Sequence, residues 1–144
     1  MAAPPEAAVA ALLDALADPE APTTVHDRAQ ARDVHVADAL SGLVVPELAA
    51  AGVIADLGSG AGLPGLVLAA ALPAARVFLV ETVRRKAEWI GETAARMGLA
   101  NAEPVWARAE EWEYAHEQRA EYGDSQREQQ NRGVDSDIFQ TRQR

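Results

Sequence analysis

A glycine-rich stretch, ADLGSGAGLPG at residues 55–65, carries the clearest chemical signal in the sequence. Gly60, Gly62 and Gly65 match G-x-G-x-x-G, the dinucleotide fingerprint. Asp56 and the two glycines that follow it equally match D-x-G-x-G, a turn that serves S-adenosylmethionine in methyltransferases. In both cases, glycines let backbone N–H groups approach a ligand where a helix begins. The two matches imply different chemistry, so the surrounding residues must decide between them.

Two carboxylates follow predicted strands near this turn. Asp56 ends a predicted strand at 52–56, where it could accept a hydrogen bond or receive the ammonium of a methionine moiety; alternatively, it caps the next helix. Glu81 ends a predicted strand at 75–81 and could accept hydrogen bonds from two ribose hydroxyls; alternatively, it is an ordinary exposed acid. NAD enzymes share the second feature, so Glu81 indicates adenosine without choosing the cofactor.

The segment ARAEEW at 107–112 follows a third predicted strand. There, the N–H of Ala109 and the carboxylate of Glu110 could read the N1 and N6 edge of adenine. The alternative is a helix start with acids near its positive end. With Asp56 and Glu81, this segment favours S-adenosylmethionine over a nicotinamide cofactor.

These residues depend on an alternating order of strands and helices. Val9, Leu12 and Leu16 have helical spacing within 5–17, and Val34, Ala37 and Leu40 are the expected apolar face of a second helix at 27–43. A helical turn is predicted at 46–51, strands at 52–56, 75–81 and 102–107, and helices at 64–72 and 84–97. The β-α-β-α-β order predicts an α/β fold of the Rossmann-like type, with a parallel sheet and helices on its faces.

The amino-acid composition excludes several classes of protein. The 144 residues carry a formal net charge of −9 and no cysteine, which excludes disulfides and thiolate metal sites and argues against gripping nucleic acid with the whole surface. No apolar run is long enough to span a membrane and no metal site is indicated, so we expect a soluble cytoplasmic protein. We divide it into a helical region (1–51), a cofactor-binding half (52–112) and a polar tail, helical or disordered (113–144).

The quoted motifs resemble the ribosomal RNA small subunit methyltransferase G family, also called glucose-inhibited division protein B. The similar segments are D-x-G-S-G-A-G-L-P-G, V-E-T-V-R-R-K-A-E-W and A-R-A-E-E-W. Upstream, DVHVADAL keeps His35 and Asp38 of an arginine-histidine-x-x-aspartate-serine segment, with Val34 and Ala39 replacing the arginine and serine. The resemblance runs from about residue 20 to residue 112 and implies methyl transfer from S-adenosylmethionine to guanine N7 of 16S rRNA. The partner that it implies is 16S rRNA or the small ribosomal subunit.

The resemblance also implies roles for individual residues. The implied cofactor contacts are Asp56, Gly58, Ser59, Gly60, Gly62, Leu63, Glu81, Ala109 and Glu110. Arg84, Arg85 and Lys86 are candidates for RNA phosphate contacts, and His35 for the substrate side of the site; a solvated helix face and a structural histidine are the alternatives. No catalytic residue is identified, because guanine N7 carries a free lone pair and positioning can supply much of the rate.

The chain departs from the family after Trp112. Family members continue with further strands and a serine-arginine-alanine segment, which has no counterpart here, so we expect a truncated member. The alternative function is a non-catalytic fragment that retains at most an adenosine-binding half-site. A third possible function is that of a nicotinamide-dependent oxidoreductase. Asp56 and the ARAEEW segment disfavour this function.

Overall fold

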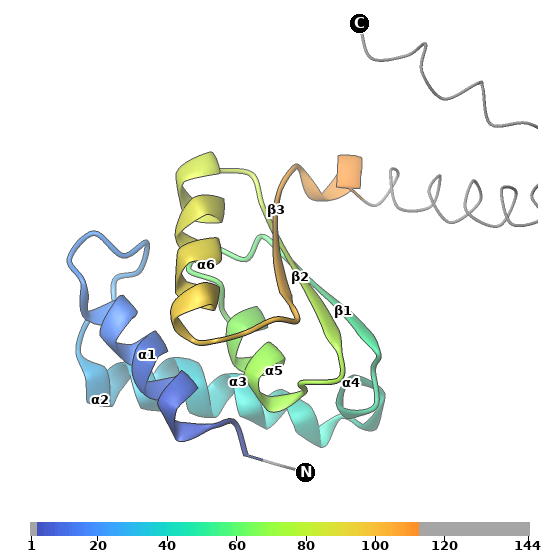
Figure 1. The fold of residues 1–144 in the computed structure, drawn as a ribbon, viewed down its shortest axis with the longest axis horizontal. Coiled ribbons are helices and arrows are strands. Elements are labelled where there is room, and N and C mark those ends of the chain that lie inside the picture. Colours follow the sequence, from blue (N-terminus) through green and yellow to red (C-terminus); the bar gives the residue numbers. More distant parts are fainter. Residues whose placement is uncertain (1–2, 113–144) are drawn as a thin grey trace, which may run out of the picture. The chain divides into compact units, whose positions relative to one another are not determined.

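The computed structural model describes residues 3–112. Residues up to Ala109 form one compact unit, in which three strands lie beside the helices (Figure 1). Glu110 begins a second unit, of which 110–112 are described. The predicted polar tail at 113–144 lies outside the described residues.

Three parallel strands form the sheet. They are β1 (Val53–Leu57), β2 (Arg76–Glu81) and β3 (Ala102–Trp106), in the order β1-β2-β3. The connections are α5 (Gly65–Ala71) and α6 (Arg84–Arg96), as the β-α-β-α-β pattern requires. The register sets Asp56 beside Leu79 and Glu81 beside Trp106. The predicted Rossmann-like α/β arrangement is therefore confirmed.

Strand β1 lies one residue later than its predicted range of 52–56 and carries exposed apolar side chains. It extends one residue further than expected, to Leu57, and Val53 and Leu57 are 63% and 53% exposed. The reason is that β1 forms an edge of the sheet within residues 3–112, and the face carrying these two side chains is not packed by α5 or α6. Asp56 points to the opposite face, which the helices cover, because successive side chains alternate along a strand.

The helices cover this face with a core of aliphatic side chains. Leu66 of α5, Leu79 of β2 and Ile90 of α6 are all fully buried in one cluster. Leu12 and Leu16 of α1 (Glu6–Ala17) join the same cluster. The core thus fixes the carboxyl ends of the strands relative to the helix that follows each one.

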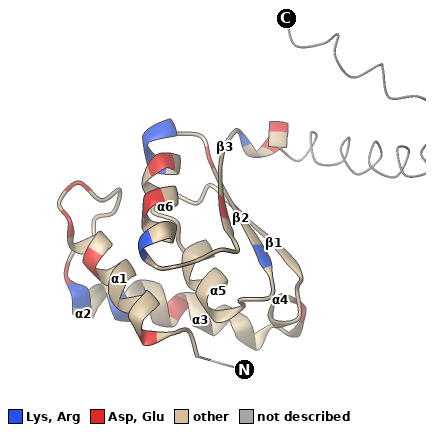
Figure 2. Cartoon of the chain, viewed as in Figure 1, with Lys and Arg blue, Asp and Glu red and all other residues tan. Residues whose placement is uncertain are grey.

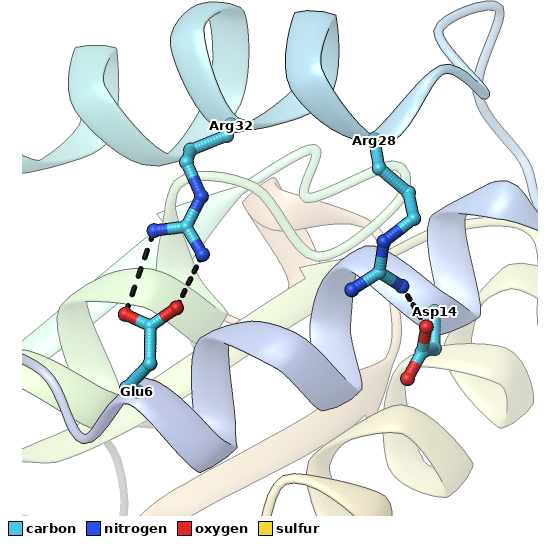
Figure 3. Close-up of polar contacts among 4 residues, drawn as sticks. All are labelled: Glu6, Asp14, Arg28 and Arg32. Carbon is cyan, nitrogen blue, oxygen red and sulfur yellow. Dashed lines mark hydrogen bonds and ion pairs between the residues drawn. The ribbon is translucent and has the colours of Figure 1, made fainter.

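A helical stretch from Arg28 to Val44 packs against α1. Its parts are α2 (Arg28–Ala31), a π-helical segment η1 (Arg32–Ala37), α3 (Asp38–Ser41) and a 3₁₀ turn η2 (Gly42–Val44). Arg28 pairs with Asp14 and Arg32 pairs with Glu6, so two ion pairs join this stretch to α1 (Figure 3). Both are exposed, so each contributes little to stability.

The prediction of which side chains form the buried face of this stretch is partly wrong. Val34 and Ala37 are exposed and Leu40 is half-buried. The buried side chains are Ala31, Val36, Ala39 and Leu43. The π-helical turn inserts one extra residue, so the inward face moves by one position relative to a regular α-helix. The stretch ends before α4 (Pro46–Ala49), which confirms the helical turn expected there.

Within the described residues, no helix has the length and apolar character that crossing a bilayer requires. The exposed side of α6 carries both basic and acidic residues (Figure 2).

Candidate functional site

The glycine-rich turn lies between β1 and α5, at the carboxyl end of the sheet. Gly58, Gly60 and Gly62 all have positive φ, at 72°, 59° and 80°. Residues other than glycine rarely adopt this left-handed backbone conformation. The glycines therefore allow the chain to reverse tightly between the strand and the helix.

Asp56 holds the two ends of this turn together. Its Oδ2 accepts hydrogen bonds from the Ser59 hydroxyl at 2.7 Å and from the Gly65 N–H at 2.9 Å. The second bond satisfies the N–H of the first residue of α5, although Asp56 is not its N-cap residue, which is Pro64. A Cβ on Gly65 would come within 2.8 Å of Asp56 Oδ2 and 2.7 Å of Leu79 Cδ2, so only glycine permits this close approach.

Glu81 holds the middle of the turn from the neighbouring strand. Its Oε2 accepts from the Gly60 N–H at 2.8 Å, and its Oε1 accepts from the Val83 N–H at 3.0 Å. Burial of the side chain, which is only 6% exposed, raises the pKa of Glu81. The hydrogen bonds from Val83 and Gly60 and the charge of Lys86 outweigh burial, so the pKa of Glu81 lies below its ordinary value.

Several backbone N–H groups of the turn already have partners within the protein, so the turn offers a ligand mainly open space. The N–H groups of Gly58 and Ser59 donate to the Val80 carbonyl, and that of Gly62 donates to Ser59. In contrast, a Cβ on Gly58 would meet nothing within 4 Å, so a ligand can approach the backbone there. Asp56 is half-buried, and its Oδ1 makes no hydrogen bond within residues 3–112.

These features fit a ligand with a cationic end and an adenosine end. A carboxylate oxygen left free beside an accessible backbone suits an ammonium group. A second ionised carboxylate on the next strand retains lone pairs for hydroxyl donors, since each oxygen can accept two hydrogen bonds. The two carboxylates lie near the carboxyl ends of adjacent parallel strands, where open α/β sheets bind ligands.

A cleft of about 590 Å³ opens beside the turn. It brings together four predicted site residues that are far apart in the sequence: His35, Ser59, Leu63 and Lys86. The Nε2 atom of His35 is buried and has no hydrogen-bond partner within the described part of the chain. A buried polar atom without a partner is costly. His35 lines the cleft as a residue, but its Nε2 atom is itself closed to solvent.

The other two predicted RNA-contacting residues do not line this cleft. Arg84 donates to Glu88 at 2.8 Å, and Arg85 donates to Glu20 at 2.7 Å. Arg85 lines a separate groove of about 740 Å³ between α6 and the segment before α2, together with acids such as Glu20 and Glu92. Lys86 lines both hollows and is the only one of the three that the structure brings to His35.

Ala109 and Glu110 follow β3 by a few residues. Ala109 ends the first compact unit and Glu110 begins the second, so their predicted adenine contacts stay a prediction.

Sequence reasoning missed one wall of the cleft. Ala21, Pro22, Thr23 and Thr24 line it, and none of them is among the site residues that the sequence predicts. Two hydroxyl side chains between a proline and the next helix were the available signal. Within the described residues, no group of three histidine or acidic side chains is arranged to hold a metal ion.

Comparison with known proteins gives a consistent result. The sequence model of the rRNA small subunit methyltransferase G family matches residues 21–123. The chain is similar to proteins named ribosomal RNA small subunit methyltransferase G in Dichelobacter nodosus (42% identical over 90 residues, 62% of this chain and 42% of the relative) and Leifsonia xyli (47% over 72 residues, 50% and 34%). The protein of that name in Synechococcus elongatus is 39% identical over 102 residues, 69% of this chain and 42% of the relative. The matches thus span only about a third to two-fifths of these relatives' length.

Proposed function

This chain belongs to the rRNA small subunit methyltransferase G family, and we propose that it binds S-adenosylmethionine and transfers the methyl group to N7 of a guanine in 16S rRNA. The observation that carries the proposal is the pair of carboxylates, Asp56 and Glu81, that hold the glycine turn from adjacent strands. If the RNA substrate is correct, the protein works in the cytoplasm.

The binding step uses three features of the turn. Asp56 Oδ1 would receive the ammonium of the methionine moiety, and Glu81 would accept hydrogen bonds from the ribose hydroxyls. The open backbone at Gly58 gives the ligand room between them. A nicotinamide cofactor would also use Glu81, but it carries no ammonium group for Asp56.

The chemical step needs little from the protein beyond positioning. S-adenosylmethionine supplies a methyl group on a positively charged sulfur. Guanine N7 has an in-plane lone pair and loses no proton when it forms the new bond, so no general base is required. The chain's part is to hold the base in line with the methyl group and to exclude water.

The cleft beside the turn is the proposed entrance for RNA. Lys86 would contact a phosphate, and His35 would form part of the wall against which the nucleotide packs. A local cation matters because the chain as a whole has a net charge of −9, which repels RNA.

Calorimetric titration with S-adenosylmethionine, with NAD as the second ligand, tests binding. Asp56→Asn keeps an oxygen that can accept from Ser59 and Gly65 but loses the negative charge. We expect the wild type to bind in the micromolar range, Asp56→Asn to bind at least about tenfold more weakly (1.4 kcal/mol), and both to melt at similar temperatures. Glu47→Gln, an exposed acid on α4, is the charge-matched control and should bind as the wild type does.

Binding of NAD in preference to S-adenosylmethionine would overturn the proposal. A second assay then tests transfer: unmodified 16S rRNA and small ribosomal subunits are incubated with the chain and the cofactor. Methylation at N7 labilises the guanine, so borohydride reduction followed by aniline treatment cleaves the strand at the product. Cofactor binding without cleavage would leave a binding function and contradict the catalytic one.

A further inference from the structure

Trp106 is an exposed aromatic side chain beside the proposed cofactor site. It is the last residue of β3, is 62% exposed, and pairs in register with Glu81. Its indole N–H donates to the Thr82 carbonyl at 3.0 Å, and the Arg84 guanidinium lies 5.5 Å from the ring centroid. The ring is thus held in one orientation although most of its surface faces solvent.

The position of Trp106 follows from the register of the sheet. Glu81 and Trp106 are neighbours on adjacent strands, so their side chains leave the same face of the sheet about 4.8 Å apart. The glycine turn lies on the other side of Glu81, at the end of β1, and Gly60 donates to Glu81 from there. Glu81 therefore lies between the turn and the indole.

An adenosine held at Glu81 can direct its base toward β3. The ribose carries the methionine chain and the adenine on different carbons, so the two groups leave it in different directions. If the methionine end lies over the turn, near Asp56, the base extends toward β3. There it meets a preoriented aromatic ring instead of bulk water.

We propose that Trp106 is the stacking surface for the adenine of the cofactor. This inference rests on the proposed function, because it takes the ribose to be held by Glu81. The ring supplies the area that a purine needs: aromatic side chains bury 150–250 Å² each, and every base has a face that can stack. The hydrogen bond to Thr82 fixes the indole before the ligand arrives, which reduces the entropy lost on binding.

Titration with S-adenosylhomocysteine, which keeps the adenosine and carries no transferable methyl group, tests the assignment. We expect Trp106→Ala to weaken binding about 5- to 100-fold, as loss of a base-stacking ring does, and Trp106→Phe to stay within about threefold of the wild type. Trp89→Phe changes a half-buried tryptophan in the separate groove along α6 and should bind as the wild type does. Melting curves of all three variants separate lost contacts from lost folding.

A direct optical readout comes from the double variant Trp89→Phe/Trp112→Phe, whose only tryptophan is Trp106. Its fluorescence should be quenched by S-adenosylhomocysteine and by adenosine, but not by methionine. If Trp106→Ala binds like the wild type while Glu81→Ala does not, the stacking role is wrong and the cofactor site stands. Quenching by a short single-stranded RNA, but not by the nucleoside ligands, would assign the ring to RNA and also overturn the inference. No binding by the wild type would overturn the cofactor site and the inference together.

Discussion

The buried carboxylate of Glu81 accepts a hydrogen bond of 2.8 Å from the backbone N–H of Gly60, 21 residues earlier in the chain. The same carboxylate accepts from Val83, where α6 begins. One side chain therefore fixes the glycine turn after β1 to the start of the helix after β2. Two short loops become a single rigid rim at the carboxyl end of the sheet.

This relationship predicts a cost for Glu81→Gln. The amide has only one oxygen, so one of the two N–H donors would face an NH₂ group and lose its partner. An unsatisfied buried donor costs about 1–3 kcal/mol, and we expect the free energy of unfolding in urea to fall by that amount. Glu103→Gln removes an exposed carboxylate that pairs with Arg76 on the sheet, and should change stability by no more than about 0.5 kcal/mol. Equal effects of the two variants would show that Glu81 does not hold the rim.

The pH dependence of the same variant is a second prediction. Because the pKa of Glu81 is lowered in the folded state, its ionised form stabilises the fold fully above the unfolded value, about 4.3. That contribution is lost as the pH falls through the lower, folded pKa. The difference in unfolding free energy between wild type and Glu81→Gln should therefore shrink progressively below about pH 4.3.

The titration of Glu6 does not affect this comparison of wild type with Glu81→Gln. The hydrogen bond and the charge of Arg32 lower the pKa of Glu6, which therefore acts in the same pH range. Glu6 is present in both proteins, so it affects both curves alike. Urea unfolding at several pH values between 3 and 7 measures the difference, and a difference that stays constant down to pH 3 contradicts the prediction.

Gly65→Ala should disturb the site through packing. The added Cβ would come within 2.7 Å of Leu79 Cδ2 and 2.8 Å of Asp56 Oδ2, and Leu79 is fully buried. Overpacking of this kind typically costs 1–3 kcal/mol, and displacement of Asp56 should also weaken cofactor binding. Gly52→Ala is the control, because its Cβ meets nothing within 4 Å and its φ is not positive. Melting and titration of both variants test the prediction, which is wrong if they behave alike.

The sequence predicted the strand-turn-helix unit because its signals are local. These signals involve only residues that are near in sequence: glycines at a tight reversal, an apolar strand at 75–81 and an acid at the end of that strand. The structure has these elements in the expected places. The same reasoning left the role of Asp56 open between ligand and helix cap. In the structure, Oδ2 accepts from the Ser59 hydroxyl and from the first N–H of α5, so Asp56 holds the turn from the end of β1, an arrangement that no spacing pattern could reveal.

The inward face of 28–44 could not be predicted by counting at helical spacing. A regular helix places Val34, Ala37 and Leu40 on one side, but the π-helical turn at 32–37 turns Val34 and Ala37 outward and Val36 inward. This turn also contains His35, and such turns are frequent at functional sites. Proximity between residues far apart in the sequence was equally hidden, including the cleft that Thr23, Thr24 and Ser59 line together.

The cleft predicts that Lys86 contributes to RNA binding but not to cofactor binding. Lys86 lines the cleft with His35, whereas Arg96 lies at the other end of α6 and lines only the separate groove. Lys86→Gln should weaken binding of a 16S rRNA fragment and reduce the slope of log affinity against log salt by about one, because one fewer phosphate is neutralised. Arg96→Gln removes the same charge from the same helix and should leave both quantities nearly unchanged.

Fluorescence anisotropy of labelled RNA at several salt concentrations measures the slope, and titration with S-adenosylhomocysteine checks that both variants retain cofactor affinity. His35→Phe should act in the same direction on RNA affinity without changing the salt slope, since it alters the wall of the cleft and removes no phosphate contact. A uniform loss for Lys86→Gln and Arg96→Gln would mean that RNA senses only the net charge of the chain. A loss confined to Lys86→Gln places the RNA in the cleft, beside the turn that would hold the methyl donor.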